Sequence, residues 1–216
     1  MWIGVWIDTW TAEGYKVWAT LKFDETEAVD FPKKKTRVLP LVNTVAYGFG
    51  QELPDFFAHK DLKIDFELPK GAKNVKLNYI TTGHGGHSGG DEFTKQKNIL
   101  KIDGKEVFSF VPWRDDCASF RRFNPSSGVW LLKDTASYLN FEKGKYMEKV
   151  IEERIASSDY SRSNWCPGSD VPPMVVDLGN IDTGKHEFTI SIPNAQPANE
   201  KELNHWLVSA YLTWEE

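Results

Sequence analysis

The chain has 216 residues, of which 40% are hydrophobic and 26% are charged, and its formal net charge is -5 at pH 7. This composition excludes a disordered tail and a disulfide miniprotein, and the length allows one large all-β domain or parts of two. No cluster of Lys and Arg suits a phosphate backbone and no apolar stretch could span a bilayer, so we expect neither nucleic acid nor membrane as a partner.

The first expected element is a hairpin over residues 2–23. MWIGVWIDTW alternates with apolar side chains on both faces, TAEG supplies a turn, and YKVWATLKF alternates again. A hairpin with two apolar faces needs partners on both sides. We therefore expect a preceding domain to cover it.

Eight further strand-length segments follow, with Gly, Pro or Asn between them. They are RVLPLV, LKIDFELP, KNVKLNYIT, NILKIDG, KEVFSFV, MVVDLG, KHEFTISIP and NHWLVSAYLTW. DGK at 103–105 and DTG at 182–184 have the chemistry of tight turns. The pattern predicts an all-β fold, an antiparallel sandwich with jelly-roll or Greek-key wiring.

One segment, residues 139–161, departs from this pattern. It places apolar residues at helical spacing with acids and bases opposite, and therefore predicts a short surface helix or another structured excursion. The residues at that spacing are Tyr146, Met147, Val150, Ile151 and Arg154.

Cys117 and Cys166 are the two cysteines of the chain. Two are too few for a four-cysteine zinc site, and their spacing is too long for a CxxC motif. They either pair, which would require an oxidising compartment, or remain two buried thiols.

The glycine-rich stretch TTGHGGHSGGDEF, residues 81–93, admits several interpretations. A metal could be held by His84 and His87 with nearby acids or His59, but flanking glycines leave the loop too loose to preorganise ligands, so we expect no metal. The stretch also lacks the GxxxxGK[ST] pattern of a phosphate-binding loop. A plain glycine turn remains open. The alternative is that the glycines let the backbone approach a ligand while Glu92, at the start of the next strand, offers a carboxylate.

Other acids deserve comparison with Glu92. Asp8 stands between tryptophans on one face of the expected first strand, where burial would raise its pKa, although structural aspartates are equally common near sheet ends. Asp115 and Asp116 beside Arg114 predict a salt-bridged turn.

The blocks IDTWTAEGYKVWATLKFD, TVAYGFG, ITTGHGG with DEF, and SRSNWCPG before VVDLG resemble, in order and spacing, the peptide-N-glycosidase F family. These bacterial amidases remove N-glycans from asparagine, and SRSNWCPG is the most specific block. The resemblance implies tandem jelly-roll domains with the active site between them. Residues 1–42 would be the final strands of the first domain and a linker, and 43–216 the second, with an insertion at about 131–160.

The resemblance also assigns site residues. Glu92 and Asp8 correspond to two supporting glutamates, Asp8 being one methylene shorter, and Arg162 to a catalytic arginine. Cys117 and Cys166 correspond to a disulfide. Contacts to substrate are implied for Trp165, Trp10, His84, Gly83 and Gly85.

The chain departs from the family in three respects. The catalytic aspartate has no counterpart in it, as though it lay in the preceding jelly-roll domain. His84 replaces a tryptophan of the glycine loop, and Gly90 and Thr94 replace two cysteines that flank the glutamate.

These correspondences predict part of an amidase that hydrolyses the N-acetylglucosamine–asparagine linkage of N-glycosylated proteins without metal or organic cofactor. One alternative is a non-catalytic module that binds glycan or protein through Trp165 and Trp113. A more distant one is a copper-monooxygenase-like sandwich, supported only by His84 and His87. Family and disulfide imply a secreted or periplasmic location, although the visible chain shows no signal peptide.

Overall fold

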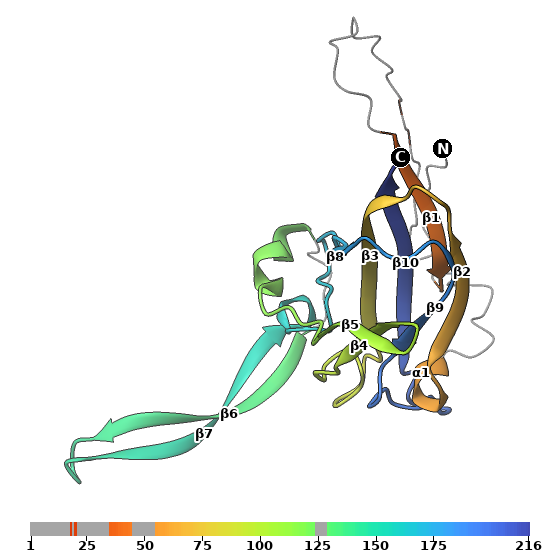
Figure 1. Ribbon diagram of the computed structural model, residues 1–216. Helices are drawn as coiled ribbons and strands as arrows, with labels where there is room; N and C mark the ends of the chain where they lie inside the picture. Colours follow the sequence, from red (N-terminus) through yellow and green to blue (C-terminus); the bar gives the residue numbers. More distant parts are fainter. Residues whose placement is uncertain (1–17, 19, 21–34, 45–54, 124–128) are drawn as a thin grey trace, which may run out of the picture. The chain divides into compact units, whose positions relative to one another are not determined.

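The computed structural model describes residues 18, 20, 35–44, 55–123 and 129–216 (Figure 1). The predicted hairpin over residues 2–23 lies outside these residues. Every described helix and strand belongs to the unit Lys34–Glu216. Within the described ranges, no helix is both long and apolar enough to cross a membrane.

Two four-stranded antiparallel sheets form the fold. The first has the order β1-β10-β3-β8 and the second β2-β9-β4-β5. The first sheet consists of β1 (Thr36–Asn43), β3 (Lys73–His84), β8 (Met174–Gly179) and β10 (His205–Glu215). The second consists of β2 (Leu62–Leu68), β4 (Asn98–Ile102), β5 (Lys105–Phe110) and β9 (Gly184–Ser191). The predicted strands from RVLPLV onward are thus confirmed.

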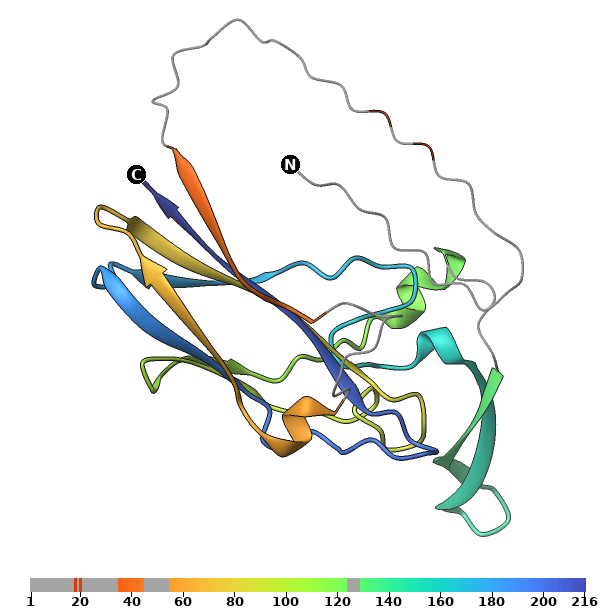
Figure 2. The same ribbon diagram turned by 90° about the vertical axis from the view of Figure 1, so that its right-hand side faces the viewer.

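The wiring of these strands is that of a jelly roll. The β6–β7 pair stands apart, so the eight remaining strands can be numbered one to eight along the chain. The first sheet then has the order 1-8-3-6, and the second sheet has the order 2-7-4-5. Consecutive strands therefore alternate between the two layers, except for the hairpin of β4 and β5, as in a double Greek key. Figures 1 and 2 show the two layers from perpendicular directions. The predicted antiparallel jelly-roll sandwich is confirmed.

The core lies between the sheets and follows from the alternation of the sequence. Along β10, every second side chain from Trp206 to Trp214 is buried. From the facing sheet, Leu100 and Ile190 are fully buried against it. Alternating strands therefore place one side-chain row inside and leave the other for solvent or loops.

The remaining strands form a hairpin, β6 (Val129–Asn140) and β7 (Lys145–Ala156). Its ladder runs without a register shift from the pair Val129–Ala156 to the pair Asn140–Lys145. The surface helix predicted within residues 139–161 is wrong. The turn before Lys145, with Gly144 at φ 59°, reverses the chain, and the cross-strand ladder satisfies backbone groups that a helix would have bonded internally.

Three short helices complete the described elements, namely α1 (Phe56–His59) and the 3-10 helices η1 (Cys117–Phe123) and η2 (Ser157–Asp159). The predicted domain boundary at residues 42 and 43 falls inside β1, which pairs with β10. Thr36–Asn43 pairs within the first sheet, and the predicted division of the chain into domains stays a prediction. The predicted insertion at about 131–160 includes most of the hairpin, and its being an insertion stays a prediction.

Candidate functional site

The candidate site lies where the loop between β3 and β4 meets the segment after β7. Ser163 is fully buried at this junction. Its backbone N–H donates to Glu92 O at 2.9 Å, and its backbone oxygen accepts from Gly83 N at 3.1 Å. Its hydroxyl lies 2.6 Å from Asp91 O and 3.0 Å from Thr94 O. Ser163 therefore fixes the loop on both sides of Glu92.

The Glu92 carboxylate is held by Arg162, which donates from Nε to Oε1 at 2.8 Å. Glu92 is only 8% exposed and Arg162 4%, so this charge-assisted bond is shielded from water. No described residue donates a hydrogen bond to Oε2. Glu92 was expected at the start of a strand, but it occupies a turn over residues 91–94, ahead of β4 at Asn98.

Aromatic rings enclose the Arg162 guanidinium. Its Cζ lies 5.3 Å from the ring centroid of Phe93 and 4.9 Å from that of Trp165, both within the range of cation–π attraction. Nη1 donates to Tyr160 O at 3.0 Å, and the Trp165 indole donates to Gly83 O at 3.0 Å. The arginine and tryptophan assigned by the resemblance therefore lie together with Glu92.

His84 extends this stack. Its ring lies 5.1 Å from that of Trp165 and 4.9 Å from that of His205, and its Nε2 is 2.8 Å from Thr82 Oγ1. Burial, with smaller contributions from the charges of His205 and Arg162, lowers the pKa of His84 to about 3. The ring is therefore neutral at neutral pH and serves as a stacking surface.

The glycines of the loop make room for the protein's own chain. A Cβ at Gly83 would lie 2.7 Å from Asp91 O and 2.8 Å from Ser163 Cβ. Gly85 has φ 141°, and a Cβ there would collide with Asn204. The role of Gly83 and Gly85 in contacting substrate stays a prediction, but close packing of three segments already accounts for glycine at both positions.

Asp91, one of the acids near His84 and His87 that the sequence offered as possible metal ligands, is fully buried. Its Oδ2 accepts from Trp206 Nε1 at 2.9 Å and from Gln196 N at 3.0 Å. Burial raises the pKa of Asp91, while hydrogen bonds from Gln196, Trp206 and Gln96 oppose that rise. The two neighbouring acids therefore have different roles. Asp91 holds the loop in place, and Glu92 binds Arg162.

The three histidines that the sequence offers as possible metal ligands each contact a different residue. His87 Nε2 lies 3.1 Å from Asn204 Oδ1, His84 lies in the aromatic stack, and His59 Nε2 lies 2.9 Å from Asp55 Oδ2. Over the described ranges, no group of three or more His, Cys, Asp or Glu side chains is placed to hold a metal ion.

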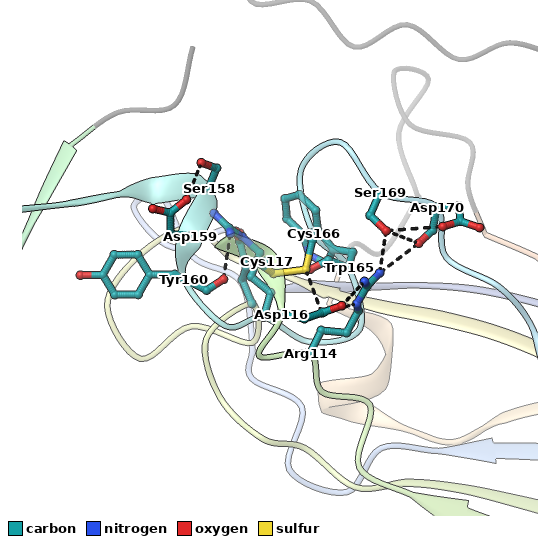
Figure 3. Close-up of a disulfide and its surroundings, with 12 residues drawn as sticks. Arg114, Asp116, Cys117, Ser158, Asp159, Tyr160, Trp165, Cys166, Ser169 and Asp170 are labelled. Atoms are coloured by element: carbon teal, nitrogen blue, oxygen red, sulfur yellow. Dashed lines mark hydrogen bonds and ion pairs between the residues drawn. A yellow bond between two sulfur atoms is a disulfide. The ribbon is translucent and has the colours of Figure 1, made fainter. Parts of the chain in front are cut away.

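Cys117 and Cys166 form a disulfide, with their Cα atoms 5.0 Å apart (Figure 3). It joins helix η1 to the WCPG block. Nearby, the backbones of Arg114 and Arg162 exchange hydrogen bonds of 2.8 and 3.0 Å, and the Arg114 side chain makes the predicted salt bridge with Asp116 at 2.8 Å. The backbone that carries Arg162 is therefore fixed from both directions.

Two predicted site residues, Asp8 and Trp10, lie outside the described residues, so the structure does not place them. The residues that it does bring together are Glu92, Arg162, Trp165, His84 and Gly83.

Known proteins resemble this chain in sequence and in fold. The family model described as peptide-N-glycosidase F, C terminal, matches residues 52–213. The solved structure of PNGF-II is 41% identical, with a TM-score of 0.67 over 83% of this chain and 30% of its own. Comparison with curated protein sequences gave no match.

More distant solved structures share the fold. A peptide-N(4)-(N-acetyl-β-D-glucosaminyl) asparagine amidase is 18% identical, with a TM-score of 0.60 over 86% of this chain and 54% of its own. PNGase F, described as a glycosylasparaginase from Flavobacterium meningosepticum, is 16% identical, with a TM-score of 0.59 over 86% of this chain and 53% of its own. The chain thus spans 30% of PNGF-II and about half of these relatives. On the family model and the identity to PNGF-II, the chain belongs to the peptide-N-glycosidase F family.

Proposed function

We propose that the chain is part of an N-glycan-releasing amidase that hydrolyses the bond between N-acetylglucosamine and asparagine in glycoproteins. The products would be aspartate in the peptide and a glycosylamine that decays in water. Membership of the family and the solved amidase with the same fold support this activity. No metal or organic cofactor is required in the proposed reaction.

The main support for the proposal is the difference in hydrogen bonding between the two oxygens of the Glu92 carboxylate. Oε1 is held by Arg162, whereas Oε2 accepts no hydrogen bond from any described residue. Oε2 is not among the described buried side-chain atoms that lack a hydrogen-bond partner, so it is open to solvent, and a sugar hydroxyl or an amide N–H can donate to it. We therefore infer that Oε2 binds the substrate.

Arg162 would stabilise the negative charge that develops on oxygen during attack on the amide. Its guanidinium is pre-positioned by Glu92, Phe93 and Trp165, so little reorganisation is needed when charge appears. The same contacts limit its rotamers.

Water activation is assigned to an aspartate of a preceding jelly-roll domain. Because the chain spans 30% of PNGF-II, this residue would come from sequence beyond the present chain. Asp8 would assist Glu92 from the N-terminal segment. Trp165, His84, Trp10, Gly83 and Gly85 are proposed to line the face on which the sugar rests.

A secreted or periplasmic location is proposed with this function. The Cys117–Cys166 disulfide fits an oxidising compartment, where glycoprotein substrates would also be met.

The decisive experiment follows glycosylated asparagine by mass spectrometry. A denatured N-glycoprotein is incubated with this chain alone and with the chain extended by its natural upstream sequence. We expect conversion to aspartate by the extended protein. Glu92→Gln, which keeps the size of the side chain but removes its charge, should lower the rate by about 100-fold.

Glu106→Gln is the matched control, because Glu106 is exposed on β5, opposite Lys101 of β4, and contacts none of the site residues named above. It should leave the rate unchanged. Absence of conversion by both forms of the protein would refute the amidase, and equal rates for Glu92→Gln and Glu106→Gln would refute the assignment of Glu92.

A further inference from the structure

Asn204, directly before β10, contacts the glycine loop of residues 81–93 and is only 1% exposed. Its Oδ1 accepts a hydrogen bond from Asp91 N at 3.0 Å, and its Nδ2 donates to Pro197 O at 3.1 Å. The backbone N–H of Asp91 can only donate and the carbonyl of Pro197 can only accept, so the orientation of the amide is fixed. His87 Nε2 lies 3.1 Å from the same Oδ1 and must therefore carry a hydrogen.

Two glycines of the loop leave space for this amide. A Cβ at Gly85 would collide with Asn204 Oδ1, and a Cβ at Gly90 would lie 3.1 Å from the same atom. The Cβ at Gly90 would also lie 2.8 Å from His87 Nε2. Because glycine has no Cβ, it lets the backbone pass this close to a buried side chain. The loop backbone is therefore closely fitted to the Asn204 amide.

Asn204 and Ser163 hold the backbone of Glu92 from its two sides. Asn204 binds the N–H of Asp91, one residue before Glu92. Ser163 N donates to the carbonyl oxygen of Glu92 at 2.9 Å. A shift of the Asp91 amide would therefore move the Glu92 side chain with it. A displacement of about 1 Å at a reacting group can cost about 100-fold in rate, so this backbone contact matters for any chemistry of Glu92.

We propose that Asn204 is a positioning residue of the site, which sets, through the N–H of Asp91, the place from which the Glu92 carboxylate meets the substrate. Asn204 acts through the backbone and touches neither the carboxylate nor the substrate. The effect on catalysis rests on the proposed function, whereas the effect on the geometry of the loop does not.

Hydrogen exchange followed by NMR tests the effect on the loop without any reaction. The exchange rate of the Asp91 amide is compared with the rates of amides in the β3–β10 ladder, so that a loss of global stability is not mistaken for a local opening. Asn204→Ala removes the acceptor and should raise this relative rate about tenfold. Asn204→Asp keeps an acceptor for Asp91 N, although it loses the donor to Pro197 O, and should raise the rate less. Gly85→Ala pushes a methyl group toward the amide and should act like Asn204→Ala.

The effect on catalysis is measured as kcat in the chain extended by its natural upstream sequence. Asn204→Ala should lower kcat by about 100-fold, and Asn204→Asp should recover part of this loss. Leu212→Ala is the control, because Leu212 is fully buried on the same strand and lies opposite Leu39 and Leu77 rather than against the loop. It should lower stability by leaving a cavity but keep the wild-type kcat at temperatures where thermal melts show every variant folded.

An unchanged relative exchange rate of the Asp91 amide in both Asn204→Ala and Gly85→Ala would refute the positioning role. An equal loss of kcat in Asn204→Ala and Leu212→Ala would also refute it, since the effect would then be one of stability alone. If the extended wild type converts no glycosylated asparagine to aspartate, the proposed function fails, while the exchange rates still decide whether Asn204 positions the loop.

Discussion

The indole of Trp206 donates a hydrogen bond to Asp91 Oδ2 over 2.9 Å and so ties the last strand of the sandwich to the loop that carries Glu92. Gln196 N donates to the same oxygen at 3.0 Å. The active-site candidate therefore rests on a buried polar contact with the core rather than on the loop's own rigidity.

Replacing Asp91 with alanine should destabilise the fold. Two donors, on Trp206 and Gln196, would lose their acceptor, at about 1–3 kcal/mol for each unsatisfied buried group. Asp91→Asn keeps an oxygen for both donors and should cost less. Urea unfolding at neutral pH measures the free energies of unfolding. Equal losses for the two variants would contradict the role of this oxygen.

Gly83→Ala should also destabilise the protein. The added methyl would lie 2.7 Å from Asp91 O and 2.8 Å from Ser163 Cβ, so the loop and the segment after β7 would have to separate. Overpacking of this kind costs about 1–3 kcal/mol. At Gly86 the nearest atom to an added methyl is Glu92 Oε2, at 3.6 Å, and Gly86→Ala is the control for stability. Thermal melts in which both variants equal the wild type would refute the close approach.

Removal of the disulfide should lower the free energy of unfolding by about 4 kcal/mol, the chain-entropy value for a separation of 49 residues. The change is made with Cys117→Ser and Cys166→Ser together, so that no free thiol remains. Reduction of the wild type should reproduce the loss in urea unfolding. A double variant as stable as the oxidised protein would show that neighbouring contacts already restrict this loop.

A pH-dependent contact links two turns of the second sheet. His186 Nδ1 lies 2.7 Å from Asp103 Oδ2 and Nε2 lies 2.8 Å from Asp182 O, so the ring is best satisfied with both nitrogens protonated. The hydrogen bond with Asp103 raises the pKa of His186, and the same bond lowers the pKa of Asp103. The stabilisation from His186 is complete below its unfolded pKa of about 6.5 and is lost as pH rises through the higher folded value.

Asp103→Asn isolates this effect. Asparagine tolerates the φ of 51° at this position and can still accept the Glu187 N–H at Oδ1, but it carries no charge. The stability difference between wild type and variant should be largest near pH 5–6 and shrink above about pH 6.5. Unfolding curves across this range would contradict the linkage if the difference stayed constant or grew.

Most of the fold, but only part of the candidate site, could be predicted from the sequence. Strands such as β10 were predictable because each alternates between a buried and a less buried row. The second strand of the hairpin was not, since Tyr146, Met147, Val150 and Ile151 are spaced in a way that fits a helix face as well as a ladder whose partner lies elsewhere in the chain. Local spacing contains no information on that partner.

The pairing of Glu92 with Arg162 illustrates the limit for the site. The residues are 70 positions apart, and in the sequence only the family resemblance connects them. Nothing local distinguishes Asp91 from Glu92, because which acid faces the core depends on the turn geometry. The signal that could have flagged Asp91 is its place beside glycines, where segments from different strands approach closely.

The hairpin of β6 and β7 starts and finishes at one place, since its terminal residues Val129 and Ala156 are ladder partners. Shortening it from the tip by matched pairs of residues would leave the spacing at its base, and hence the connection to the jelly roll, unchanged. The length of the hairpin can therefore vary. Natural variation or engineering can lengthen, shorten or replace the hairpin while the part of the jelly roll that positions Glu92 and Arg162 stays unchanged.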